Sequence, residues 1–215
     1  MKFEKTEVWG FEHAIRGMRN PLESWDKSDS CYIDKRFNDQ FHIGKNDLAL
    51  MQKLIKAGSE HRKFLRQIFV AVDITAPLYF FKELDTYKVG TVANSTSTMH
   101  KLASTPITID CFEMDDFEDC KDDSNVYVSA IWIESITRLE KLRQTYNATK
   151  DKRYWKELIR LLPESWLQKR TITMNYENIL NMYRQRKNHK LTEWSKSFCD
   201  WLKTLPYAEE LICLE

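Results

Sequence analysis

The chain has 215 residues, of which 33 are Lys or Arg and 32 are Asp or Glu, so its formal net charge is +1. This length suits one globular domain, or one domain with a sizeable appendage, and the 42% of hydrophobic residues is enough to form a core. The balanced charge excludes a bulk electrostatic attraction to nucleic acid or to an anionic membrane, although it permits local charged patches.

Glycine is scarce, and its distribution excludes the two common phosphate-binding loops. The chain has only five glycines, Gly10, Gly17, Gly44, Gly58 and Gly90. No two of them are close enough for a GxGxxG fingerprint or a GxxxxGK[ST] loop. Any nucleotide would therefore have to bind without a glycine-rich cradle.

The cysteines and histidines show no metal or redox motif. None of the five cysteines lies in a CxxC pair, and the five histidines form no HxH, HxxxH or HExxH pattern, so we expect no metal site. No serine or cysteine has the local signature of a nucleophile, so no catalytic residue is assigned. The N-terminus lacks the apolar centre of a signal peptide, and no run reaches the about 18 apolar residues of a membrane span. We expect a cytoplasmic protein.

The first elements in chain order form a strand followed by helices. Residues 2–9 alternate loosely and predict an edge strand, and a short helix is expected at 10–18. The polar and aromatic segment 20–44 predicts irregular structure. Asn46 or Asp47 is then expected to cap a helix with apolar residues at 3/4 spacing.

A buried strand is predicted at 68–74, where IFVAVDI is β-branched and aromatic. Pro77 ends this strand and starts a helix over 78–88. The charge-poor stretch 89–100, VGTVANSTSTMH, predicts a loop against something polar.

The second half of the chain is predicted to be helical. Residues 107–117 predict a strand, and an acidic connector follows at about 110–125. The helical half spans about 126–205, and its helices are expected near 126–147, 151–162, 175–188 and 190–204. The prediction is one α+β domain over residues 1–215.

One helix in this half has two unusual faces. Asn175, Ile179, Met182 and Arg186 fall at offsets 0, 4, 7 and 11, which places an amide and a guanidinium on either side of an apolar patch. A second stripe consists only of amides, at Asn178, Asn181, Gln185 and Asn188. These amides form either a solvated or interface face, or a row that reads the edge of a heterocycle while Arg186 binds an anion.

The same helix carries a family resemblance. Leu162-Pro163 is followed, after eleven residues, by N-Y-E-N-I-L-N-M-Y-R-Q-R from Asn175 to Arg186. This resembles the pattern N-x-R-S-L-x-N/H-F-L-x-L-R of the flavin-dependent thymidylate synthases. The resemblance implies that Asn175 and Asn181 contact flavin and that Arg186 contacts the nucleotide. Arg160 lies one position out of register with a phosphate-binding Arg of the family.

A second matching stretch runs from Gly58 to Leu102. The family has Glu-His, a strand, Ala-Pro, a helix and then RHRxxSxNExSxRY, whereas this chain has Arg66-Gln67, the same series of elements, and TYKVGTVANSTSTM over 86–99. Thr91 and Thr96 stand for the two serines of the motif, and Asn94 stands for its Glu.

The chain also departs from this motif. Thr86-Tyr87-Lys88 replaces Arg-His-Arg, and Thr98-Met99 replaces Arg-Tyr. Lys88 keeps one positive charge, but without the fork geometry of arginine. Glu83 takes the place of a Gln that touches the nucleotide.

The resemblance implies an α+β fold with a mixed or antiparallel sheet, assembled as a homotetramer. It implies reductive methylation of dUMP to dTMP with FAD, with methylenetetrahydrofolate and NADPH as co-substrates. The implied flavin-side residues are Gln67, Lys88, Asn175 and Asn181. The implied substrate-side residues are Glu83, Thr91, Asn94, Thr96, Arg160 and Arg186.

Two alternatives stay open. Loss of the motif arginines favours a catalytically divergent or inactive nucleotide-binding oligomer of the same fold. Residues 150–190, with twelve Lys, Arg or His against four Asp or Glu, allow a nucleic-acid-binding helical module. No aromatic stacking pattern accompanies this basic stretch, so nucleic acid is the less favoured partner.

Overall fold

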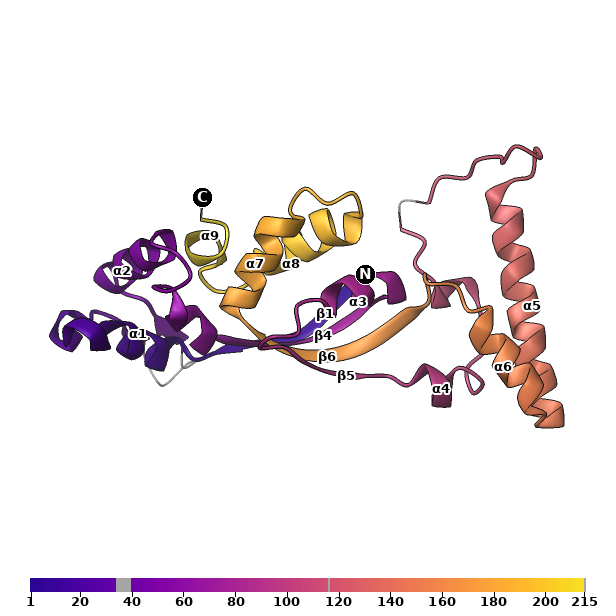
Figure 1. The fold of residues 1–215 in the computed structure, drawn as a ribbon, viewed down its shortest axis with the longest axis horizontal. Helices are drawn as coiled ribbons and strands as arrows, with labels where there is room; N and C mark the ends of the chain where they lie inside the picture. Colours follow the sequence, from indigo (N-terminus) through magenta and orange to yellow (C-terminus); the bar gives the residue numbers. More distant parts are fainter. Residues whose placement is uncertain (34–39, 116, 215) are drawn as a thin grey trace. The chain divides into compact units, whose positions relative to one another are not determined.

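A computed structural model describes residues 1–33, 40–115 and 117–214 (Figure 1). The parts of the predictions for 20–44 and for the acidic connector that fall on 34–39 and 116 lie outside these residues. The described chain divides into two compact units. Unit 1 consists of Met1–Lys2, Ile74–Asp85 and Asn94–Arg170, and unit 2 consists of Phe3–Asp73, Thr86–Ala93 and Thr171–Glu215. The single domain expected from the sequence stays a prediction.

The main sheet has four strands in the order β1-β4-β6-β5, and all four have residues in both units. The strands are β1 (Lys2–Trp9), β4 (Phe69–Pro77), β5 (Val92–Ser95) and β6 (Leu167–Asn175). Because β1 lies at one edge and the β-branched run forms most of β4, both strand predictions are confirmed. The predicted α+β class is also confirmed, with an antiparallel sheet.

The sheet also contains strands that the sequence did not predict. The central strand β6 was not predicted, and β5 lies in a stretch predicted as a loop. A second sheet pairs β2 (Cys31–Ile33) with β3 (Gln40–His42) antiparallel, inside the segment predicted as irregular. The prediction for 20–44 is therefore wrong at these two strands, because cross-strand pairing overrides the polar composition.

Unit 2 is built from helices around the aromatic core residues Phe64, Tyr176, Trp194 and Phe198. Its longer helices are α1 (Phe11–Arg19), α2 (Lys45–Lys56) and α7 (Tyr176–Arg186). Its shorter ones are η1 (Asn20–Leu22), η2 (Trp25–Lys27), η3 (Lys63–Gln67), the π-helix η5 (Glu193–Phe198), α8 (Cys199–Leu202) and α9 (Ala208–Leu211). The 3-10 helix η3 packs against both α1 and α7.

The start of α2 differs from the sequence prediction. Its N-cap residue is Gly44, not Asn46 or Asp47. The carboxylate of Asp29 accepts hydrogen bonds from the backbone N–H groups of Asn46 and Asp47, at 2.9 and 3.1 Å. A residue from outside the helix therefore satisfies its first free donors, and the Asp47 side chain makes other contacts.

Unit 1 contains α3 (Leu78–Leu84), α4 (Thr98–Lys101), η4 (Ile109–Cys111), α5 (Val128–Thr149) and α6 (Lys152–Arg160). Helix α5 packs against α6. The hydrophobic core of unit 1 consists of Leu102, Ile107, Phe112, Leu139 and Leu158.

The strand predicted at 107–117 is wrong. The segment forms η4 and a single bridge between Phe112 and Trp166. The backbone N–H of Ile107 donates to Glu140 instead of to a neighbouring strand. Among the described residues, no helix combines the length and the apolar character needed to cross a membrane.

Candidate functional site

The ten site residues predicted from the sequence divide between the two units. Gln67, Lys88, Thr91, Asn175, Asn181 and Arg186 belong to unit 2. Glu83, Asn94, Thr96 and Arg160 belong to unit 1.

In unit 2 the segment Thr86–Ala93 lies against α7. The Asn178 amide donates to the Val89 carbonyl at 2.7 Å, and the Tyr87 hydroxyl donates to Gln185 Oε1 at 2.9 Å. A Cβ added at Gly90, whose φ is +81°, would lie 2.8 Å from Asn175 Nδ2. Two members of the amide stripe therefore bind the protein's own loop, and this loop carries Lys88 and Thr91 past α7.

Asn175 is a helix cap. Its side chain accepts from the Asn178 backbone N–H at 3.0 Å, and Asn178 Oδ1 accepts from the Asn175 backbone N–H at 3.1 Å. This reciprocal capping box satisfies two donors at the start of α7. Because Asn175 is only 7% exposed, its amide has a fixed direction beside the loop.

Arg186, at the end of α7, lies among aromatic side chains. Its Nε donates to the Tyr87 hydroxyl at 3.1 Å, and its guanidinium lies 5.8 and 5.4 Å from the ring centroids of Tyr87 and Trp194. The aromatic faces hold the planar cation, which suits it to bind a carboxylate or phosphate. Tyr87 is the residue that replaces the His of the family motif.

The buried Glu177 is the centre of an ion-pair cluster in unit 2 that the sequence did not predict. Arg62 Nε donates to Glu177 Oε1 at 3.1 Å, Arg66 Nε donates to Glu177 Oε2, and Arg62 Nη2 donates to Asn181 Oδ1 at 3.1 Å. Burial alone would raise the pKa of Glu177, but the two arginines outweigh it and lower the pKa. The signal in the sequence is the i, i+4 spacing of Glu177 and Asn181, which places both side chains on one face of α7.

The charges of this cluster are the reverse of the family pattern. Glu177 stands where the pattern has its first Arg, and Arg66 stands where the family has Glu. Asn181, expected on the flavin side, has its oxygen occupied by Arg62.

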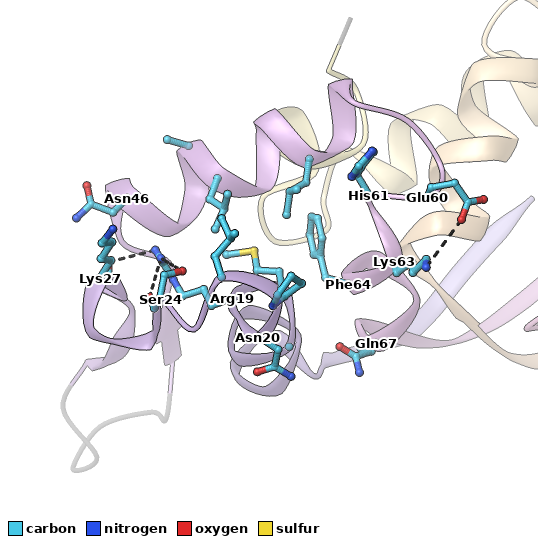
Figure 2. A pocket seen from close by; sticks show the side chains of 17 residues that line it. Arg19, Asn20, Ser24, Lys27, Asn46, Glu60, His61, Lys63, Phe64 and Gln67 are labelled. Atoms are coloured by element: carbon cyan, nitrogen blue, oxygen red, sulfur yellow. Dashed lines mark hydrogen bonds and ion pairs between the residues drawn. The ribbon is translucent and has the colours of Figure 1, made fainter.

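Gln67 lines a pocket of about 1070 Å³ in unit 2 (Figure 2). Leu50, Leu54 and Phe64 contribute apolar walls, and Lys63 lies at the rim in an ion pair with Glu60 at 3.8 Å. The pocket thus combines apolar surface with a polar edge, the usual character of a small-molecule site.

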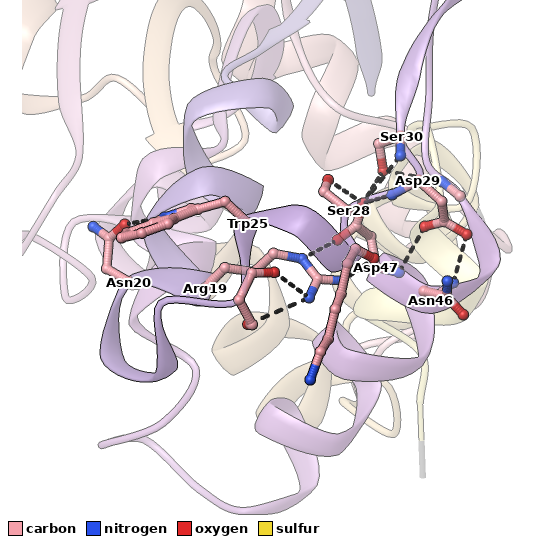
Figure 3. Close-up of polar contacts among 11 residues, drawn as sticks. Arg19, Asn20, Trp25, Ser28, Asp29, Ser30, Asn46 and Asp47 are labelled. Atoms are coloured by element: carbon pink, nitrogen blue, oxygen red, sulfur yellow. Dashed lines mark hydrogen bonds and ion pairs between the residues drawn. The ribbon is translucent and has the colours of Figure 1, made fainter.

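A buried network fixes the other wall of this pocket (Figure 3). Arg19 Nε donates to Asp47 Oδ1 at 2.6 Å, and Asp47 Oδ2 accepts from the hydroxyls of Ser28 and Ser30 at 2.7 and 2.6 Å. Arg19 also donates to the Lys27 carbonyl at 3.1 Å. These bonds tie the segment after α1 to the first turn of α2.

In unit 1 the predicted residues are mostly exposed. Thr96 extends β5 toward β6, because its N–H donates to the Lys169 carbonyl at 2.9 Å. It also lines a pocket of about 840 Å³ with Lys101. Asn94 is exposed on β5, Glu83 is half-buried on α3, and the exposed Arg160 forms an ion pair with Glu157 at 2.5 Å.

The basic stretch 150–190 is likewise divided between the two units. Within it, Arg153, Arg160 and Arg170 form ion pairs with Asp151, Glu157 and Asp85. Part of its positive charge is therefore neutralised within the chain.

The donor set of unit 2 fits the flavin that the resemblance implies. A flavin dinucleotide needs amide partners at the edge of its ring and cations at its diphosphate. Gln67 supplies an exposed amide and Asn175 supplies its Nδ2, because its oxygen caps α7, while Lys88 and Arg66 are exposed cations. Within residues 1–33, 40–115 and 117–214, no group of three His, Cys, Asp or Glu is placed to hold a metal ion.

Comparisons with known proteins give a result at the level of structure only. No family model matches the sequence, and no curated protein sequence matches it significantly. Flavin-dependent thymidylate synthase from Helicobacter pylori, solved in complex with FAD and dUMP, is similar in structure with a TM-score of 0.71, 17% identity and full coverage of both chains. A second structure of that enzyme with FAD and dUMP gives a TM-score of 0.69 at 17% identity, covering 100% of this chain and 99% of that one. The chain therefore has the fold of the flavin-dependent thymidylate synthases.

Proposed function

We propose that this protein binds a flavin and a pyrimidine nucleotide and methylates dUMP to dTMP reductively. The observation that carries the proposal is the packing of Thr86–Ala93 on α7, which holds Lys88 and Thr91 beside a capped Asn175. These residues occupy the motif positions of the flavin-dependent thymidylate synthases, in a fold whose solved examples hold FAD and dUMP.

The residues of unit 2 have distinct roles in this proposal. Arg186 binds the anionic part of the nucleotide with a guanidinium that Tyr87 and Trp194 keep in place. Asn175 and Gln67 direct amides to the flavin ring, and Lys88 adds positive charge. When bound, reduced flavin would supply the hydride and methylenetetrahydrofolate the one-carbon unit, with NADPH restoring the reduced flavin. The residues of the chain bind and orient the reactants, and no cysteine nucleophile is required.

The proposal includes a cytoplasmic homotetramer in which Glu83, Asn94, Thr96 and Arg160 complete the substrate side. Light scattering coupled to gel filtration measures the assembly directly. A monomer that binds both ligands would contradict the tetramer and leave the ligand assignment standing.

The first experiment uses the absorbance of the purified protein. Flavin bands at about 370 and 450 nm, or the appearance of these bands after addition of FAD, are expected. Mass spectrometry then detects dTMP formed from dUMP in the presence of NADPH and methylenetetrahydrofolate. Protein that takes up no FAD and forms no dTMP contradicts the proposal.

Arg186→Ala gives the test at residue level. Loss of a charge-assisted hydrogen bond should weaken dUMP binding at least about tenfold by calorimetry, with the oligomer unchanged. Arg160→Ala is the companion variant, because Arg160 is the other arginine assigned to the substrate. Unchanged dUMP affinity in Arg186→Ala contradicts the assignment of Arg186.

A second candidate function is nucleotide binding without catalysis. Two observations favour it: Tyr87 and Thr98 replace motif residues, and Arg62 occupies the Asn181 oxygen. This alternative predicts dUMP binding that depends on Arg186, with neither FAD uptake nor dTMP formation.

A further inference from the structure

Three arginines of unit 2 lie on two elements that pack together, and two of them bind one carboxylate. Arg62 is the N-cap residue of η3 and Arg66 lies within it. Arg184 lies on α7, three residues after Asn181 and so on the same side of the helix as Glu177 and Asn181. The two η3-side arginines both donate to Glu177, whose side chain is only 10% exposed. Glu177 thus holds their guanidinium groups in fixed positions beside α7.

The cluster has more positive charge than its own carboxylate can neutralise. Arg184 is exposed and makes no hydrogen bond or ion pair with any residue that the structure describes. Partial desolvation against α7 and its neighbours lowers the pKa of Arg184, and the nearby positive charge of Arg62 lowers it further. The neighbouring Lys63 pairs with Glu60, so that pair adds no net charge. Of these three arginines, Glu177 binds Arg62 and Arg66 only, so the like charge of Arg184 beside Arg62 has no carboxylate of its own within the cluster.

We propose that Arg62, Arg66 and Arg184 form a binding site for a phosphate-class anion, the diphosphate of the flavin cofactor. This inference rests on the proposed function and adds to it residues at which the family pattern has no arginine. Guanidinium forks bind phosphate oxygens in pairs, whereas the ammonium of Lys88 acts as a point charge. The cluster supplies positive charge to a chain in which Thr86 and Thr98 replace motif arginines.

The experiment compares FAD with riboflavin, which lacks phosphate. Flavin binding is measured by fluorescence quenching for the wild-type protein, Arg184→Gln, Arg66→Gln and the control Arg138→Gln, a surface arginine of unit 1 that is 73% exposed. Each cluster variant should lose about tenfold in FAD affinity and none in riboflavin affinity. Arg184→Lys should recover part of the loss, Arg138→Gln should match the wild type, and inorganic pyrophosphate should compete with FAD only when the cluster is intact.

Further arms separate this inference from the proposed function. If the wild type binds FAD and both cluster variants bind it equally well, the anion site is wrong and the proposed function stands. An equal loss of FAD and riboflavin binding would mean a structural role and also overturns the site. If the variants keep FAD but lose dUMP relative to deoxyuridine, the cluster binds phosphate from the nucleotide, and the assignment to the flavin is wrong. If the wild type takes up no flavin, the proposed function fails, and calorimetry with inorganic pyrophosphate tests the anion site alone.

Discussion

Each unit fastens a loop to a helix with an arginine–carboxylate pair, but the two pairs differ in burial. In unit 2, Asp47 is fully buried and binds Arg19, which is 4% exposed. In unit 1, Glu140 and Arg143 have side chains that are 20% and 13% exposed. Both carboxylates accept several hydrogen bonds, so the comparison separates the effect of burial from that of hydrogen-bond number.

The difference shows how each network gains its strength. Burial alone would raise the pKa of Asp47, and the hydrogen bonds of Ser30, Ser28 and Arg19 must outweigh this before the pKa is lowered. For Glu140 the hydrogen bonds of Arg143 are the largest cause, burial opposes them less, and the pKa falls to about 2. The buried network around Asp47 thus depends on all of its hydrogen-bond partners being present. Around the more exposed Glu140, water can replace a lost partner in part.

The largest expected effect is that of Asp47→Ala. The substitution leaves Arg19 buried without its carboxylate and removes the acceptor of both serine hydroxyls, so unfolding free energy should fall by about 3–5 kcal/mol. Urea denaturation followed by circular dichroism measures the change. A loss below about 1 kcal/mol would mean that water hydrates Arg19 in the variant and replaces the missing carboxylate, as we expect for the more exposed pair of unit 1.

Gly90→Ala tests a second contact between a loop and a helix in unit 2, the packing of Thr86–Ala93 against α7. The added Cβ meets Asn175 Nδ2 at 2.8 Å in a backbone with φ of +81°, so we expect a loss of about 2 kcal/mol and weaker flavin binding. Gly58→Ala is the matched control, because Gly58 has φ of +109° but its Cβ would meet nothing within 4 Å. Equal losses in both variants would mean that backbone strain alone is at work and that the close approach to Asn175 adds nothing.

Glu140 in unit 1 should make stability depend on pH. Its folded pKa of about 2 lies below its ordinary value of 4.5, so its contribution is fully present above about pH 4.5 and is lost as pH falls toward 2. Because water reaches the pair, we expect about 1 kcal/mol rather than the full value of the shift. Urea denaturation at neutral and acidic pH should show a smaller acid loss in Glu140→Gln than in the wild type. Identical pH profiles would contradict the lowered pKa.

The sequence predicted elements whose cause is local. The β-branched run of β4, the spacing of α1 and the long helix α5 all follow from patterns within a short window. Strand β6 was missed because Lys169 and Arg170 interrupt its apolar alternation, although it lies beside β4 in the sheet. Its place is set by pairing with strands far away in the chain.

The candidate site divides in the same way. The register of α7 predicts Asn175 and Arg186 as site residues from the sequence alone, and this assignment stays a prediction. The pair of Arg62 with Glu177 joins residues 115 positions apart, and no spacing rule reaches that distance. The amide stripe can be seen in the sequence, but the hydrogen bonds of Asn178 and Gln185 to Val89 and Tyr87 depend on a loop that the fold brings close.

The smallest expected effect lies on α5, where one helix carries two arginine–glutamate pairs. Arg138 and Glu134 form an i, i+4 pair at 2.7 Å with side chains 73% and 65% exposed. Arg138→Ala should change unfolding free energy by at most about 0.5 kcal/mol, because solvent screens the pair and the side chains gain freedom. Arg143→Ala, on the same helix, also removes a hydrogen bond to the Ala103 carbonyl and should cost about 1–2 kcal/mol. The two pairs have similar N–O distances, 2.7 and 2.6 Å, and differ in burial. If both variants lose the same free energy of unfolding, burial does not determine how much such a pair stabilises the fold, and it then does not explain the difference between Asp47 and Glu140.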